Sequence, residues 1–159
     1  DEAIKLSNER LESIYAGIFL DIERQVNLKL RAFNKVVYGP FRASSELRIK
    51  SASSYKFTSP ADTGTGKSYA GLIGFDLAML SLTRLPLCLH DSIIYKNIEV
   101  PAIRRILRIL GAIKSKQIFL SFDEAKKFGP EAELLLKRFT VLKLGHNDLL
   151  YTKDWRDQH

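Results

Sequence analysis

The chain has 159 residues, 45% of them hydrophobic, and a formal net charge of +7. This length supports one domain with a hydrophobic core and is too short for two. The positive charge favours an anionic partner, either a nucleic acid or a nucleotide, without choosing between them.

The only cysteine, Cys88, lies in an apolar run over residues 85–90. A single cysteine excludes a disulfide framework within the chain, and we expect no zinc cluster either, so a reducing cytosolic compartment fits best. No apolar run approaches the roughly 18 residues that a membrane span needs. The acidic start at Asp1 is unlike a signal peptide, and a first residue other than methionine is expected of a fragment or a processed product.

Residues 1–37 contain no proline and one glycine. Ile4, Leu11 and Ile18 recur every seven residues with charged residues between them, which predicts a long amphipathic helix. The end of a coiled coil and an ordinary core helix both fit so short a repeat. Gly39 and Pro40 end the helix, so we divide the chain into a long helix over 1–38 and a globular lobe over 39–159.

The rest of the chain alternates strand and helix patterns. Residues 46–50 and 54–58 alternate apolar with polar side chains across a Ser/Ala turn, which predicts a β-hairpin with one buried face. Apolar spacing and turn residues then predict helices over 69–80, 101–113 and 131–138, and strands over 87–91, 117–121, 140–144 and 149–151. This order is typical of an α/β fold with a mostly parallel sheet flanked by helices.

Residues 59–71, SPADTGTGKSYAG, fit the loose form of a phosphate-binding loop, because four residues separate Ala61 from Gly66-Lys67-Ser68. A true P-loop follows a buried parallel strand and wraps its backbone N–H groups around phosphates. Here the preceding segment alternates as a half-exposed hairpin strand does, and Ala61 replaces the first glycine. A Walker A loop using Lys67 and a flexible glycine turn both stay open on these residues alone.

An apolar strand ending in Asp91 follows the glycine loop. A carboxylate at the C-terminal end of a strand can reach a Mg²⁺ ion that bridges nucleotide phosphates, as a Walker B aspartate does. A strand that ends in aspartate is also common as a cap or a structural feature. Asp91 is therefore informative only in combination with the glycine loop.

The order of glycine loop, buried helix, acid-ended strand, amphipathic helix and short strand resembles the C-terminal half of the ATPase heads of structural-maintenance-of-chromosomes (SMC) and related double-strand-break-repair proteins. The chain is also similar to a bacterial family of this superfamily, domain of unknown function 2326, over about residues 54–155. The matching sequence segments are Asp62-Thr-Gly-Thr-Gly66, Phe75-Asp-Leu77, Leu85-Pro-Leu-Cys-Leu-His-Asp-Ser92, Lys116-Gln-Ile-Phe119, Val141-Leu-Lys-Leu144 and Leu150-Tyr-Thr-Lys-Asp-Trp155.

The resemblance implies ATP and Mg²⁺ as cofactors. In this superfamily the glycine loop is the ABC signature motif, whose hydroxyl and backbone N–H groups contact the γ-phosphate of a nucleotide held by the opposing head. The residues at this position are Thr63, Gly64, Thr65 and Gly66. Lys67 would then be an auxiliary cation, and the positive end of a helix beginning near Ser68 would add to the attraction.

The resemblance also implies that Asp91 holds Mg²⁺ through water on the nucleotide of its own head. The superfamily usually places a catalytic glutamate directly after this aspartate, whereas this chain has Ser92, which cannot act as a carboxylate base. Asp123 and Glu124, after the next strand, are candidates for a compensating base. Asp123 can also be an N-cap of the segment that follows it.

The implied protein is one lobe of an ATPase, inactive alone. It would need an N-terminal Walker A lobe from the same or a partner chain and a second head in a homodimer, with DNA as a further candidate partner and no membrane. Its expected setting is the bacterial cytoplasm, in DNA maintenance, DNA repair or defence against phage and other mobile elements. Two alternatives stay open: a self-contained small P-loop NTPase or kinase using Lys67 and Asp91, and a non-catalytic DNA-binding or interaction module.

Two other features have a structural and a functional interpretation. His90 precedes Asp91, but neighbouring residues of a strand face opposite ways, so we expect a satisfied interior histidine. Arg104, Arg105 and Arg108 form a stripe that either faces DNA phosphates or is the solvated side of an amphipathic helix.

Overall fold

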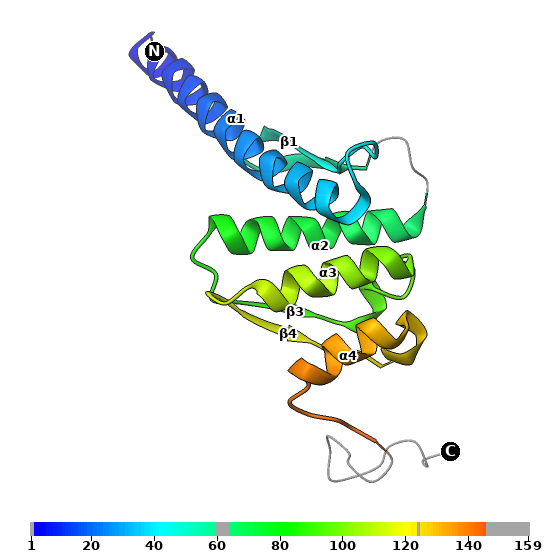
Figure 1. The fold of residues 1–159 in the computed structure, drawn as a ribbon. Helices are drawn as coiled ribbons and strands as arrows, with labels where there is room; N and C mark the ends of the chain where they lie inside the picture. Colours follow the sequence, from blue (N-terminus) through cyan, green and yellow to red (C-terminus); the bar gives the residue numbers. More distant parts are fainter. Residues whose placement is uncertain (1, 60–63, 124, 146–159) are drawn as a thin grey trace, which may run out of the picture.

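The computed structural model describes residues 2–59, 64–123 and 125–145 (Figure 1). The elements in chain order are α1 (Glu2–Tyr38), β1 (Glu46–Ser51), β2 (Ser54–Thr58), α2 (Thr65–Leu82), β3 (Leu87–His90), the 3-10 turn η1 (Ser92–Ile94), α3 (Val100–Ala112), β4 (Gln117–Leu120), the 3-10 turn η2 (Ala125–Phe128) and α4 (Pro130–Phe139). The predicted order of helices and strands is confirmed as far as α4. Within the described ranges, no helix has the length and apolar character that crossing a membrane requires.

The strands form two separate pairs. β1 and β2 make the predicted antiparallel hairpin, and β3 and β4 pair in parallel with Leu87 opposite Gln117. The architecture is therefore mixed α/β. The prediction of a mostly parallel sheet is not confirmed, because β3–β4 is the one parallel pair in the described part of the chain.

The strand predicted over residues 140–144 is wrong. Residues 140–145 have no regular secondary structure, and Val141 is 98% exposed. An isolated apolar segment does not form a strand without a partner to complete its hydrogen bonds, and none lies beside it among the described residues. The strand predicted over 149–151 lies outside those residues.

The long helix α1 has two different halves. Its N-terminal half extends beyond the body of the molecule (Figure 1), and Ile4 there is 65% exposed. Its C-terminal half buries Val26 and Leu30. The Asn27 side chain donates to the Leu47 carbonyl at 2.9 Å and accepts from the Leu47 N–H at 2.8 Å, so it holds the hairpin against α1.

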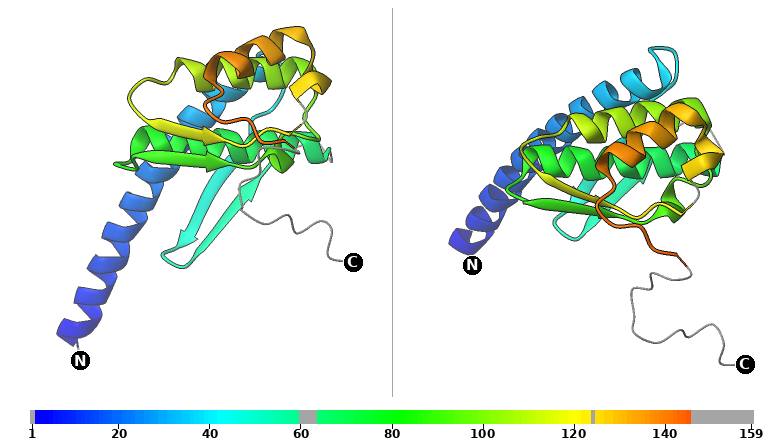
Figure 2. Two further views of the ribbon diagram at one scale, coloured as in Figure 1. Left: turned by 90° about the horizontal axis from the view of Figure 1, so that it is seen from below. Right: turned by 60° about the horizontal axis from the view of Figure 1, so that its bottom comes forward.

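The core forms around α2, which has α1 and the hairpin on one side and α3 with the β3–β4 pair on the other (Figure 1). A Cβ at Gly74 would lie 2.7 Å from the Phe33 ring of α1, so glycine permits this close approach. From α3, Ile103 and Ile106 are fully buried, as its amphipathic pattern predicts. Figure 2 shows α3 and α4 on one side of the β3–β4 pair.

The other face of the β3–β4 pair is open to solvent. Successive strand residues point to opposite faces, and Leu87, Leu89 and Phe119 are 40%, 70% and 44% exposed. We call these three residues the exposed sheet face.

Candidate functional site

Most of the predicted site residues lie on one side of the molecule. α2 begins there, and β3 and β4 end there (Figure 1). Asp91 follows β3 directly, and Asp123 comes shortly after β4. The start of α2 approaches the segment after η1 so closely that a Cβ at Gly66 would lie 2.1 Å from the Asn97 carbonyl oxygen. The fold therefore brings the glycine segment near the chain that leaves β3.

Much of the predicted glycine loop is helical. Gly64 is the N-cap of α2, with φ −74° and no side-chain cap, so Thr65 to Ser68 form the first turn. The N–H groups of Lys67 and Ser68 both donate to the Gly64 carbonyl, whereas those of Thr65 and Gly66 have no acceptor within the helix. This end of α2 thus offers two donors and the positive end of a helix dipole to an anion. Thr63 lies outside the described residues.

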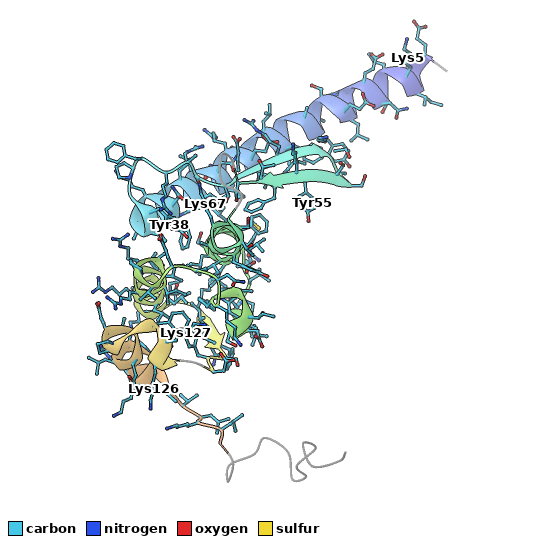
Figure 3. All side chains as sticks on the ribbon, turned by 90° about the vertical axis from the view of Figure 1, so that its right-hand side faces the viewer. Lys5, Tyr38, Tyr55, Lys67, Lys126 and Lys127 are labelled. Carbon is cyan, nitrogen blue, oxygen red and sulfur yellow. The ribbon has the colours of Figure 1, made fainter. Side chains whose placement is uncertain are left out.

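The surroundings of Lys67 differ from those of a Walker lysine. The preceding strand β2 belongs to the antiparallel hairpin and not to the parallel pair, so the buried parallel strand that a P-loop follows is missing there. Lys67 lines a small cavity together with Phe33 and Tyr38 of α1 (Figure 3). The lysine is therefore directed toward the α1 side of α2.

Asp91 is exposed and caps η1. Its Oδ1 accepts a hydrogen bond from the Ile93 N–H at 2.9 Å, so the capping interpretation of this aspartate is confirmed. Ser92 is buried, at 8% exposure. A single exposed carboxylate still suits Mg²⁺, which is commonly held through water by one or two carboxylates together with substrate phosphates.

Asp123 forms an ion pair that the sequence did not predict. Its Oδ2 lies 2.7 Å from the Lys96 Nζ, and hydrogen bonds from Lys96 and then Ser92 hold the pKa of Asp123 below its ordinary value. A lowered pKa makes the carboxylate a weaker proton acceptor near neutral pH. No local pattern marks Lys96, because this contact exists only in the folded chain. Glu124 lies outside the described residues.

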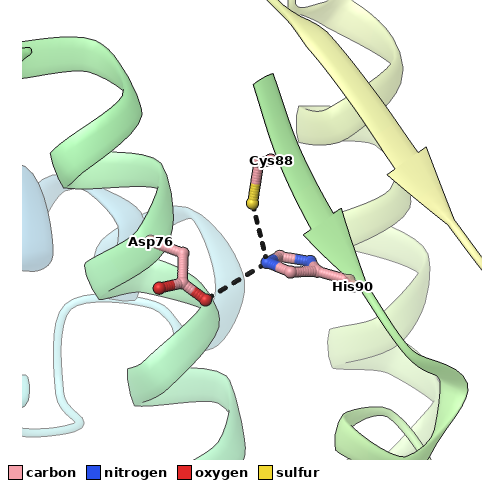
Figure 4. A group of neighbouring side chains, drawn as sticks. All are labelled: Asp76, Cys88 and His90. Carbon is pink, nitrogen blue, oxygen red and sulfur yellow. Dashed lines mark hydrogen bonds and ion pairs between the residues drawn. The ribbon is translucent and has the colours of Figure 1, made fainter. Parts of the chain in front are cut away.

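A second group of polar side chains lies between α2 and β3 (Figure 4). The Nε2 atom of His90 is 3.1 Å from the Cys88 Sγ and 3.2 Å from the Asp76 Oδ2, and its Nδ1 is 2.7 Å from the Tyr95 hydroxyl. His90 is buried and hydrogen-bonded, so the expectation of an interior histidine is confirmed. Burial, with the charge of Asp76 as a second cause, raises the pKa of the Cys88 thiol.

Asp76 was missed as a site residue. Asp76 and Lys67 are the two charged residues of α2. A single acidic residue in a helix that is otherwise largely apolar is the sequence signal that could have identified Asp76. The expectation of no zinc cluster rested on counting cysteines. It did not foresee that folding would bring a carboxylate, a thiol and an imidazole together.

The arginine stripe of α3 makes contacts within the chain. The Arg105 Nη1 donates to the Val37 carbonyl at 2.6 Å, and Arg104 and Arg108 both pair with Glu131. These contacts give all three arginines a structural role in joining α3 to α1 and α4.

The chain is similar to solved structures of SMC heads at low sequence identity. One is an Smc head domain with an extended coiled coil bound to the C-terminal domain of ScpA, from Pyrococcus furiosus: the TM-score is 0.51, the identity is 17%, and the match covers 77% of this chain and 35% of that one. Another, from work on ATP-driven dimerization and DNA-stimulated activation of SMC ATPases, has a TM-score of 0.48 at 14% identity, covering 65% and 70% of the two chains. The chain thus spans about a third of the first structure.

No curated protein matches the chain. Its sequence matches the family described as "Uncharacterised protein conserved in bacteria (DUF2326)" over residues 15–153. Because this match spans most of the chain, the chain belongs to the DUF2326 family.

Proposed function

We propose that this chain is the C-terminal lobe of an SMC-like ATPase head, which contributes a signature motif and a Walker B aspartate to an ATP site formed when two heads meet. The observation that carries the proposal is the position of the α2 N-terminus and the C-terminal ends of β3 and β4 on one side of the molecule (Figure 1). Nucleotide sites in α/β proteins form outside the carboxyl ends of parallel strands.

The signature motif in this proposal consists of Thr63, Gly64, Thr65 and Gly66, with Lys67 and Ser68 beside it. The N–H groups of Thr65 and Gly66, which have no acceptor within the helix, suit a phosphate. The Lys67 side chain is directed toward α1, which favours an auxiliary role over a Walker role. The phosphate contacted by this motif belongs to ATP bound by the opposing head.

Asp91 holds Mg²⁺ through water in this proposal, and Mg²⁺ when bound neutralises charge on the nucleotide phosphates. Ser92, in the position after Asp91, helps to orient the attacking water but cannot accept its proton as a carboxylate does. Asp123 or Glu124 supplies that carboxylate. Asp123 gains basicity when nucleotide phosphates draw Lys96 away from it, because the ion pair lowers its pKa.

The exposed sheet face is the proposed contact for the missing Walker A lobe. Its apolar side chains remain open to solvent in this chain, and an apolar sheet face is stabilised by covering it. The exposed heptad residues of α1, Ile4, Leu11 and Ile18, belong to the returning arm of a coiled coil. This assigns residues 1–38 to the arm and 39–159 to the head lobe.

The partners in this proposal are the Walker A lobe on the same or a partner chain, a second identical head, and DNA. The setting is the bacterial cytoplasm, in DNA maintenance, DNA repair or defence against phage and other mobile elements. The analogy for a partner protein comes from the similar Smc head structure, which is bound to the C-terminal domain of ScpA.

Nucleotide turnover with and without the Walker A lobe tests the proposal. We expect no turnover by this chain alone, turnover when the lobe is supplied, and loss of that turnover in Asp91→Ala. Tight ATP binding by this chain alone that disappears in Lys67→Ala would instead establish a self-contained P-loop. No ATP binding by the complete head would identify a non-catalytic module.

A further inference from the structure

Three potential metal ligands of different chemistry meet between α2 and β3. Cys88 and His90 are two residues apart on β3, so they share its inward face, and α2 places Asp76 opposite them (Figure 4). One ligand atom from each residue lies within 4.8 Å of the other two. The His90 side chain is 2% exposed, whereas that of Asp76 is 46% exposed, so the group is anchored in the core and reachable from solvent.

The side chains of Cys88 and Asp76 compete for the same atom of His90. The Cys88 Sγ and the Asp76 Oδ2 both approach the same atom, the His90 Nε2. In a neutral imidazole that nitrogen carries either one N–H or one lone pair. It can therefore donate to the carboxylate or accept from the thiol, but it cannot do both. A cation between the three atoms would interact favourably with all of them.

We propose that Asp76, Cys88 and His90 bind a Zn²⁺ ion, with water as the fourth ligand. In a tetrahedral zinc site, bonds of roughly 2.0–2.3 Å place neighbouring ligand atoms about 3.3–3.6 Å apart. The Nε2 atom is already 3.1 Å from the sulfur and 3.2 Å from the carboxylate oxygen. Small side-chain rotations suffice, and the partly exposed Asp76 is free to make the largest one.

The ligand set favours zinc over the cation of a nucleotide site. Mg²⁺ and Ca²⁺ prefer oxygen ligands, whereas thiolate and imidazole together select zinc and similar transition metals. Binding would deprotonate the Cys88 thiol and release its proton. The Asp76–Cys88–His90 group is therefore a site separate from Asp91, whose single carboxylate suits Mg²⁺.

Tyr95 orients the His90 ring for metal binding. Its hydroxyl lies 2.7 Å from the His90 Nδ1, and the residue is 0% exposed. When Nδ1–H donates to the Tyr95 oxygen, the Nε2 lone pair points toward the cysteine and the aspartate. Outer partners of this kind orient metal-binding histidines in many proteins. The bound ion would tie α2 to β3 one residue before Asp91.

Cobalt titration of the intact chain tests the site without nucleotide, so its outcome is independent of the proposed ATPase. Co²⁺ substitutes for Zn²⁺ and absorbs in the near ultraviolet when a thiolate binds it. We expect one Co²⁺ per chain with this absorption, and its displacement by Zn²⁺. Cys88→Ser removes the absorption, and Tyr95→Phe weakens binding by about 10–100-fold while leaving the absorption in place.

Matched controls separate this site from adventitious binding. Asp76→Asn is expected to weaken binding at least about tenfold, while Asp21→Asn on α1 and the double substitution of His146 and His159 by asparagine leave it unchanged. Circular dichroism establishes that each variant is folded. Binding without the thiolate absorption, equal affinity in Asp76→Asn and Asp21→Asn, or no binding at all by the unaltered chain overturns the proposal.

Discussion

Gly66 lies in the first turn of α2, where the Asn97 carbonyl oxygen would be 2.1 Å from an added Cβ. Gly66→Ala gains about 1 kcal/mol of helix propensity and costs about 1–3 kcal/mol through overpacking, so we expect a net loss of stability. Gly17→Ala, on exposed α1 with nothing within 4 Å, is the control and should gain up to about 1 kcal/mol. Urea unfolding measures both, and equal effects would show that Gly66 is not closely packed.

The packing at Gly66 bears on the interpretation of the glycine motif. Packing against Asn97 already requires glycine there, whatever the loop binds. Gly64 has no such contact described and takes a φ of −74°, which any residue adopts. Gly64 is therefore the better position at which to test phosphate binding.

The pKa of Asp123 should depend on Lys96. Their ion pair and the Ser92 hydrogen bond lower this pKa from its ordinary value of 3.8, so Lys96→Met should raise it. A depressed folded-state pKa stabilises the fold above pH 3.8, and this contribution is lost as the pH falls through the lowered value. Carboxyl NMR titration of Asp123 measures the change. An unchanged pKa in Lys96→Met would contradict the ion pair.

Between elements, Arg105 connects α3 to the last turn of α1 through the Val37 carbonyl. Carbonyls at a helix C-terminus have no partner within the helix, so Arg105 supplies the donor that Val37 lacks. We expect Arg105→Met to lower the free energy of unfolding by about 1 kcal/mol. This is less than the value of a buried hydrogen bond to a charged group, because the arginine is partly solvated. Arg10→Met, on the exposed part of α1, should change stability by less than about 0.5 kcal/mol. Thermal unfolding compares them, and equal stabilities would argue that the Arg105 contact contributes nothing.

Elements whose formation depends on local spacing were predictable. The alternating pattern of the hairpin and the helical spacing of apolar residues in α3, every three or four residues, place polar and apolar side chains where the structure has them. The strand expected over 140–144 failed because its apolar residues meet no partner strand in the described part of the chain. The predicted start of α2 was four residues too late, because glycine and threonine are poor helix formers.

For the molecule as a whole, the resemblance to the DUF2326 family correctly identified the family of the chain, whereas contacts between residues far apart in the sequence could not be predicted. Lys96 reaches Asp123, and Asp76 reaches Cys88 and His90, only because α2 folds onto β3 and β4 ends beside β3. Spacing along the chain contains no signal for such contacts. The position of Asp91 was predictable, because a residue that directly follows a parallel strand lies at the carboxyl edge of the sheet, where nucleotide sites form.

The central claim is that the glycine motif of one head serves the ATP held by the other, and a subunit-mixing experiment tests it. Gly64→Asp adds a negative charge at the start of α2 and keeps the helix, because aspartate is a favoured N-cap. Gly64→Asn is the neutral control. In complete heads with the Walker A lobe, Gly64→Asp and Asp91→Ala should each be inactive alone.

Mixing the two inactive variants is the decisive measurement. If each site combines Asp91 from one head with the motif of the other, every mixed dimer retains one intact site, and random pairing restores about one quarter of the unaltered turnover. If Gly64 and Asp91 serve the same nucleotide within one head, both sites of every mixed dimer are defective. Restored turnover is the result that the proposal predicts, and no turnover in the mixture would contradict it.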